Sequence, residues 1–182
     1  FSPSVSSKLI VQVREPLQRL GEICKGLFLV GDLTEKTKAH IMSYGELLSS
    51  RIVAAAMEHE GLSPTWVDSR KTIVTDSQYL SARVDFTATN RLIRDEILRD
   101  TRIYIAPGYI ARSTSGESTT LGRGGSDYTA AIFAGALNAD LLEIWTDVNG
   151  MMSADPRLVR DTITIPEMSY EEAMELSYFG AK

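Results

Sequence analysis

The stretch TTLGRGGSDYTAA, residues 119–131, most constrains the fold of this chain. A short β-like run breaks there into glycines and then enters an alanine-rich segment typical of a helix. Gly122, Gly124 and Gly125 carry no Cβ, so the backbone can turn sharply and approach a ligand closely. We therefore expect a strand, a tight turn and the N-terminus of a helix. Free backbone N–H groups at such a corner suit a carboxylate or a phosphate.

The polar residues of this turn add to that expectation. Ser126 is the predicted N-cap of the helix, ahead of Asp127. Arg123 carries a guanidinium that can hold an oxyanion with two hydrogen bonds. The turn is not a P-loop, because no Gly-Lys-Ser/Thr follows, and Asp127 stands where the dinucleotide fingerprint requires its last glycine. An ordinary glycine-rich turn with an N-cap therefore stays open as the plainer interpretation.

The order of apolar runs and helical stretches predicts an α/β fold. Residues 1–60 read as mainly helical, with Pro16 expected to kink the first helix or divide it in two. The strand candidates that follow are 64–67, 72–75, 102–106 and 141–145, and the helix candidates are 83–98 and 127–138. The run 110–118 is too polar for a core and is predicted to be a mobile loop over the site. The pattern favours a three-layer sandwich with a mostly parallel sheet, which binds ligands at the carboxyl ends of its strands.

Two capping-box patterns, each a serine followed three residues later by a glutamate, predict helix starts. The first is Ser43 with Glu46, ahead of a periodic apolar face, and the second is Ser169 with Glu172 near the C-terminus.

Composition excludes several classes of protein. The net charge of −5 argues against nucleic acid as the main partner, because phosphate backbones select basic surfaces. Cys24 is the single cysteine, so no internal disulfide can form, and we expect it to be at least half-buried. With only His40 and His59 to help, no metal-binding cluster is visible. No apolar run is long enough to span a bilayer, and we expect a cytoplasmic protein.

Three longer stretches carry a resemblance to a known family. GRGGSDYTAA, WTDVNGMMSADPR and MSYEEAMELSYFGAK, with SYGE upstream, resemble the catalytic domain of aspartate kinases, which belong to the amino acid kinase family. The sequences of the last stretch and of EIWTDVNG especially resemble those of the bifunctional enzymes in which the kinase is fused to homoserine dehydrogenase. The resemblance implies that residues 1–182 are part of a single catalytic domain with an amino acid kinase-like fold. Within it, residues 61–182 are the α/β part that carries the nucleotide and substrate loops.

The resemblance also implies site residues. It assigns the substrate aspartate to Glu46, Arg123, Gly124, Gly125 and Ser126, with Glu46 contacting the ammonium group. It gives Asp127 the role of orienting a catalytic lysine, and it places Lys182 on the phosphates. The nucleotide would contact Thr146, Asp147, Met152, Arg157 and Lys182. Met152 departs from the family, where an aromatic residue is frequent, although its thioether could pack on adenine.

The implied reaction is transfer of the ATP γ-phosphate, with Mg²⁺, to the side-chain carboxylate of L-aspartate. This is the first step of lysine, threonine and methionine biosynthesis. The family opens with a K-F-G-G strand that residues 1–182 lack, so we expect one partial domain that is inactive alone and forms a homo-oligomer. NADP would be used only if a dehydrogenase domain follows. Another amino acid kinase, of the acetylglutamate or glutamate type, and a non-catalytic nucleotide-binding or regulatory domain are the alternatives.

Overall fold

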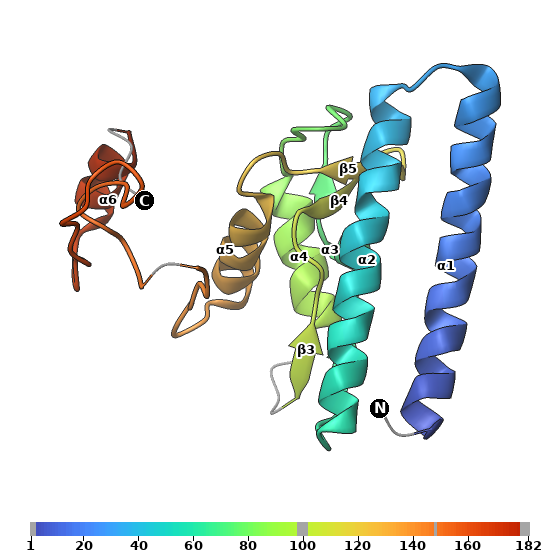
Figure 1. The fold of residues 1–182 in the computed structure, drawn as a ribbon, viewed down its shortest axis with the longest axis horizontal. Coiled ribbons are helices and arrows are strands. Elements are labelled where there is room, and N and C mark those ends of the chain that lie inside the picture. Colours follow the sequence, from blue (N-terminus) through green and yellow to red (C-terminus); the bar gives the residue numbers. More distant parts are fainter. Residues whose placement is uncertain (1–2, 98–101, 148, 179–182) are drawn as a thin grey trace. The chain divides into compact units, whose positions relative to one another are not determined.

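The computed structural model describes residues 3–97, 102–147 and 149–178. The chain divides into two compact units, Phe1–Leu142 and Glu143–Lys182 (Figure 1). Among the described residues, no helix combines the length and the apolar character that crossing a bilayer requires.

Two long helices open the first unit and lie side by side (Figure 1). The helix α1 covers Pro3–Val30 and α2 covers Glu35–His59. The helix α1 is continuous through Pro16, so of the two outcomes predicted there the division into two helices is wrong. A proline removes one backbone hydrogen bond, but α1 packs along α2 and this packing maintains the helix on both sides of it. Cys24 is exposed on α1 rather than half-buried.

The start of α2 contradicts the capping box predicted at Ser43. The N-cap is Thr34, whose side chain accepts a hydrogen bond from the N–H of Thr37 at 3.2 Å. Ser43 and Glu46 therefore lie inside the helix, where backbone N–H groups already have helical partners and need no cap. The Ser43 hydroxyl donates instead to the carbonyl of His40, at 2.6 Å.

Five short strands form two small sheets behind α2. The strand β1 (Pro64–Trp66) pairs in parallel with β3 (Ile103–Ile105). The strand β2 (Val74–Thr75) pairs in parallel with β4 (Ile110–Ser113), and β4 pairs antiparallel with β5 (Ser118–Thr120). Two of these three pairings are parallel, as the sequence predicted.

The hairpin of β4 and β5 replaces the mobile loop predicted for residues 110–118. Ile110, Ala111 and Ser113 are fully buried. The polar residues of this hairpin are accommodated because they are hydrogen-bonded, as in the 2.8 Å bond between the hydroxyls of Thr75 and Thr119. A polar composition therefore did not indicate an exposed loop here.

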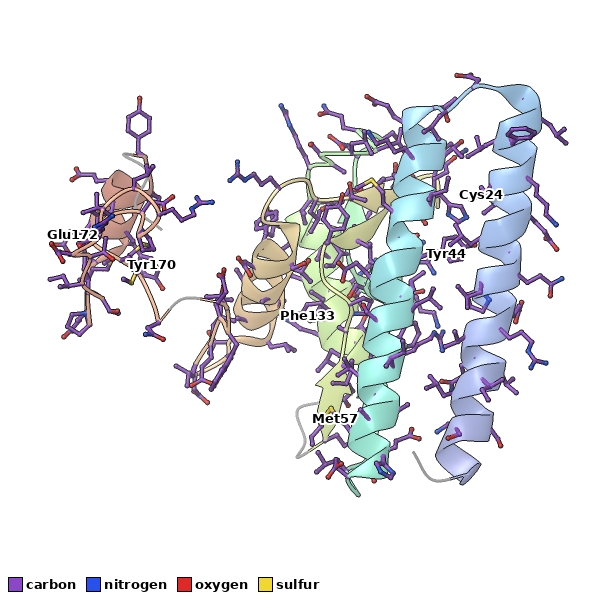
Figure 2. The ribbon with its side chains drawn as sticks, viewed as in Figure 1. Cys24, Tyr44, Met57, Phe133, Tyr170 and Glu172 are labelled. Carbon is purple, nitrogen blue, oxygen red and sulfur yellow. The ribbon has the colours of Figure 1, made fainter. Side chains whose placement is uncertain are left out.

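The remaining helices of this unit pack against the strands or against one another. They are α3 (Ser69–Thr72), α4 (Phe86–Glu96) and α5 (Gly125–Leu137). The core contains Ile73, Ile93 and Ile132, and Phe133 of α5 packs against it (Figure 2). With α2 on one face of the strands and α4 and α5 on the other, these elements form three layers, and α1 packs on α2 outside them.

The second unit contains one helix, α6 (Tyr170–Tyr178), among its described residues. The predicted capping box is present, because the N–H of Ser169 donates to Glu172 at 2.7 Å and the N–H of Glu172 donates to the Ser169 hydroxyl at 3.2 Å. The strand predicted at 141–145 is wrong. No neighbouring strand pairs with it in the part of the chain that the structure describes, and Trp145 is 89% exposed.

Candidate functional site

The glycine turn, residues 122–127, follows β5 and includes the first three residues of α5. Gly122 and Gly124 have φ values of +76° and +72°, which residues with a Cβ rarely adopt. The N-cap of α5 is Gly124 rather than the predicted Ser126, because the carbonyl of Gly124 accepts the first helical bond, from the N–H of Tyr128 at 3.0 Å. Ser126 and Asp127 therefore lie in the first turn, where backbone N–H groups have no partner within the helix.

The glycine turn is held by close packing against the segment between β3 and β4. A Cβ on Gly108 would lie 2.9 Å from the Cα of Ser126, and one on Gly125 would lie 2.8 Å from Cδ2 of Tyr109. Thr129 connects the same two segments, because its hydroxyl donates to the carbonyl of Gly125 at 2.7 Å and accepts from the N–H of Tyr109 at 3.0 Å. The position of the helix N-terminus is thus fixed by contacts from two directions.

An open hollow of about 360 Å³ lies over this turn. It is lined by Glu46, Tyr109 and the six residues of the glycine turn. Glu46 comes from the middle of α2, and the observed helix start leaves its carboxylate free of any capping role. Burial raises the pKa of the Glu46 carboxyl. The hollow therefore combines a carboxylate on α2 with a guanidinium and helix N–H groups on the other side.

Tyr109 was not among the residues that sequence reasoning selected. It has a left-handed backbone, with φ of 69°, and its hydroxyl lies 3.9 Å from the sulfur of Met42. A non-glycine residue in this conformation is uncommon and is retained where the surrounding structure fixes it. The signal that could have found it is its place, directly after a predicted strand and the Pro107-Gly108 pair.

Four of the residues predicted to contact a nucleotide lie in the second unit. The hydroxyl of Thr146 donates to Asp147 at 3.2 Å. Arg157 forms a two-point ion pair with Asp155, with Nε to Oδ1 at 3.0 Å and Nη2 to Oδ2 at 2.6 Å, and this hydrogen bonding raises the pKa of Arg157. The sulfur of Met152 accepts a hydrogen bond from Thr164 at 3.4 Å. Lys182 and the rest of the F-G-A-K stretch lie outside the described residues.

Comparison with known proteins gives one consistent picture. The model described as "Amino acid kinase family" matches residues 11–182. The bifunctional aspartokinase/homoserine dehydrogenase of Haemophilus influenzae is 42% identical over 153 residues, which are 84% of this chain and 19% of that protein. Lysine-sensitive aspartokinase 3 of Escherichia coli is 36% identical over 174 residues, which are 93% of this chain and 39% of that protein.

A solved structure agrees with these relatives. The crystal structure of E. coli aspartokinase III in complex with aspartate and ADP matches with a TM-score of 0.87 and 32% identity, over 93% of this chain and 38% of that one. The chain thus spans about a fifth of the bifunctional relatives and about two fifths of the shorter aspartokinases.

Proposed function

The chain belongs to the amino acid kinase family, and we propose that it forms part of the catalytic domain of an aspartokinase. The whole protein would transfer the γ-phosphate of ATP to the side-chain carboxylate of L-aspartate, giving 4-phospho-L-aspartate. The observation that carries this proposal is the hollow in which Glu46 and the glycine turn meet. The biosynthetic pathway, a homo-oligomeric state, a cytoplasmic location and a fused NADP-dependent dehydrogenase belong to the same proposal.

The hollow suits a zwitterionic amino acid. The carboxylate of Glu46 would pair with the substrate ammonium group, since opposite charges form the stronger class of hydrogen bond. Arg123 and the N–H groups of Ser126 and Asp127 in the first turn of α5 would hold a substrate carboxylate. Gly125 lines the same hollow, and its own N–H donates to the carbonyl of Gly122 at 3.0 Å. Gly124, in the left-handed region, allows the backbone to present these groups without an intervening side chain.

The chemistry requires charge neutralisation more than a base. The attacking carboxylate is already a nucleophile, so the difficulty is bringing it against an anionic triphosphate. We assign Asp127 to orienting a lysine and Lys182 to the phosphates. Thr146, Asp147, Met152 and Arg157 would contact the nucleotide. Mg²⁺ bound to the phosphates would neutralise charge on the transferring group.

Glu46 also favours aspartate over the main alternative within the family. Acetylglutamate has no ammonium group, so the half-buried carboxylate of Glu46 would find no cationic group on that ligand. A free amino acid with an ammonium group satisfies it.

The test is an aspartyl hydroxamate assay on the full-length gene product with ATP and Mg²⁺. We expect turnover with L-aspartate, and none with N-acetyl-L-glutamate at the same concentration. Arg123→Lys should lower kcat/KM for aspartate at least tenfold, because a lysine cannot reproduce two parallel hydrogen bonds. Turnover of acetylglutamate in this assay would refute the proposal. Titration of the same protein with ATP tests the alternative of a non-catalytic domain, and no nucleotide binding would also refute the proposal.

A further inference from the structure

A second hollow, of about 300 Å³, lies between α1, α2 and α3 and shares no residue with the one over the glycine turn. Its charged lining is Arg19, Arg51 and Arg70 against the single acid Glu15. The chain as a whole carries a net charge of −5, so this excess of positive charge is local. Such a concentration in a concave site raises the local concentration of anions.

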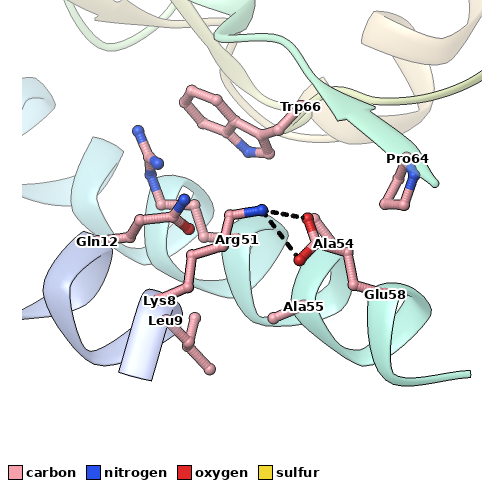
Figure 3. A pocket seen from close by; sticks show the side chains of 9 residues that line it. All are labelled: Lys8, Leu9, Gln12, Arg51, Ala54, Ala55, Glu58, Pro64 and Trp66. Carbon is pink, nitrogen blue, oxygen red and sulfur yellow. Dashed lines mark hydrogen bonds and ion pairs between the residues drawn. The ribbon is translucent and has the colours of Figure 1, made fainter. Parts of the chain in front are cut away.

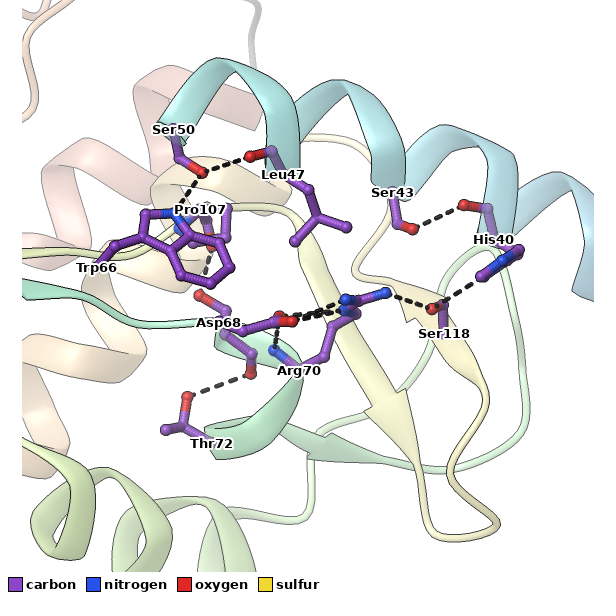
Figure 4. Close-up of polar contacts among 11 residues, drawn as sticks. His40, Ser43, Leu47, Ser50, Trp66, Asp68, Arg70, Thr72, Pro107 and Ser118 are labelled. Carbon is purple, nitrogen blue, oxygen red and sulfur yellow. Dashed lines mark hydrogen bonds and ion pairs between the residues drawn. The ribbon is translucent and has the colours of Figure 1, made fainter. Parts of the chain in front are cut away.

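Two of the three guanidinium groups are fixed in place by neighbours. Arg70 donates from Nε to Asp68 Oδ1 at 3.0 Å and from Nη2 to Asp68 Oδ2 at 2.7 Å, while its Nη1 donates to the Ser118 hydroxyl at 3.2 Å (Figure 4). Arg51 lies over the ring of Trp66, with Cζ 3.8 Å from the ring centroid. Groups that are already ordered lose less entropy when they bind a ligand.

Arg51 also lines a neighbouring hollow farther along the same helix pair (Figure 3). There Lys8 of α1 pairs with Glu58 of α2, with Nζ to Oε1 at 2.8 Å, so the positive charge is matched. Among the described residues Arg19 forms no such ion pair, and Glu15 is the one acid that lines the same hollow. Arg70 is paired with Asp68, so the unmatched positive charge of the lining belongs to Arg19 and Arg51.

The wall of the hollow also contains His40. Its Nδ1 lies 3.3 Å from the Ser118 hydroxyl (Figure 4). Its ring meets that of Tyr44 edge to face, with the ring centroids 5.3 Å apart. Burial lowers the pKa of His40, and the charges of Arg70 and Arg19 lower it further. The groups that face it are Glu15 and Arg19 of α1, Tyr44 of α2, Arg70 of α3 and Ser118 of β5. An anion between them would relieve this repulsion.

The other side of Arg70 opens on an adjoining hollow with the same character. Lys71 and Arg112 line it with Asp68, Arg70, Gly116 and Ser118. The Nε of Arg112 is buried without a hydrogen-bond partner among the described residues. Buried donors of this kind are rare in folded proteins.

We propose that the hollow bounded by Arg19, Arg51 and Arg70 binds a small oxyanion, a phosphate or carboxylate group, carried on an apolar body. The arginines receive the anionic group. The apolar body lies against Pro16 and Leu48, the partly exposed apolar residues of the lining, while Leu47 and the ring of Tyr44 are almost fully buried. Binding draws a proton onto His40, because the anion reverses the effect of the neighbouring arginines on its pKa.

Calorimetric titration of the full-length gene product tests this site. Phenyl phosphate and benzoate are the probes, and they separate phosphate from carboxylate recognition. All titrations use an Arg123→Gln background, which removes anion binding at the glycine turn. We expect saturable binding of at least one probe, weakened about tenfold or more by Arg19→Gln or Arg51→Gln. Arg14→Gln, on the same helix but outside the hollow, is the matched control and should bind as the parent does.

Proton uptake gives an independent measurement. Titration at about pH 6 in two buffers of different ionisation enthalpy should show uptake of a proton on binding, lost in His40→Gln. Arg19 is exposed on α1, so its substitution should leave the fold intact. Absence of saturable binding, equal affinity of the Arg19 and Arg14 variants, or binding without proton uptake would each overturn the proposal.

Discussion

Glu46 of α2 and Arg123 of the glycine turn line the same hollow. They come from distant parts of the sequence and carry opposite charges, which suits a ligand that carries both charges itself. The relationship depends on α2 beginning at Glu35, because a helix that began after Ser43 would have kept Glu46 at its cap.

Removal of the Glu46 charge should affect the amino acid substrate alone. We expect Glu46→Gln to raise KM for aspartate about tenfold or more, because the ammonium group loses a charged partner. KM for ATP should stay within about twofold of the parent. Steady-state kinetics of the full-length gene product measure both, and Glu22→Gln on the exposed face of α1 is the control. Equal increases in the two KM values would argue against the assigned role.

The raised pKa of Glu46 predicts a pH dependence of substrate binding. Only the ionised carboxyl attracts an ammonium group, so affinity for aspartate should increase as pH rises through a value above the ordinary 4.5 and level off beyond it. Binding titrations across this range should show the step in the parent and its absence in Glu46→Gln. A step that survives the substitution would belong to another group.

Gly108 should tolerate no side chain. A Cβ there would lie 2.9 Å from the Cα of Ser126, so Gly108→Ala must shift the first turn of α5. We expect a loss of about 1–3 kcal/mol in the free energy of unfolding, with a fall in kcat/KM.

Gly135→Ala, in α5, is the matched control for Gly108→Ala. A Cβ at Gly135 would have nothing within 4 Å, so the substitution should stabilise the protein by about 0.5–1 kcal/mol. Denaturant unfolding measures both variants, and similar effects of the two would show that the packing of Gly108 is unimportant.

Glu117 should make the protein sensitive to acid. Hydrogen bonds from Ser115 and Ser113, and then from Lys36, lower the pKa of its carboxyl from 4.5 to about 2. Because the folded pKa lies below the unfolded one, the stabilisation is present above about pH 4.5 and is lost as pH falls toward about 2. The difference in Tm between the parent and Glu117→Gln should shrink over that interval, while Glu22→Gln shows no such trend. A constant difference would contradict the assignment.

The capping box of α6 should stabilise that helix measurably. Ser169→Ala removes the acceptor for the N–H of Glu172 and should cost about 1 kcal/mol of local stability. Amide hydrogen exchange over residues 170–178 should accelerate accordingly. Glu171→Gln, in the same turn but outside the box, is the control, and equal acceleration in both variants would show that charge near the helix start, rather than the cap, is responsible.

Local patterns in the sequence were sufficient where the neighbouring residues alone decide the conformation. The glycine turn, the helix that follows it and the capping box at Ser169 were predicted because each depends on backbone freedom or hydrogen bonds within a few residues. The mostly parallel pairing followed from alternating strands and helices. The N-cap of α5 was misplaced from Gly124 to Ser126, since glycine at this position leaves no side-chain signal.

Predictions failed where distant residues decide. The run 110–118 was predicted to be a loop because it is polar. In the structure it belongs to a buried hairpin, because Thr75 and its neighbours form hydrogen bonds with the polar residues. The segment 141–145 has the composition of a strand, but a strand forms only where another strand accepts its hydrogen bonds. Pro16 did not interrupt α1, because packing against α2 extends along the helix.

The sequence by itself thus determined the α/β class, the glycine turn suited to an anion and the family resemblance, because each of these depends on residues that are adjacent in the sequence. Only the tertiary structure decided that Glu46 is free of a cap and shares a hollow with Arg123, that Tyr109 lines it, and that Arg19, Arg51 and Arg70 gather in a second one. The physical reason is that a binding site is formed by side chains from separate helices and strands. Its geometry depends on which helix start and which strand pairing the whole chain stabilises.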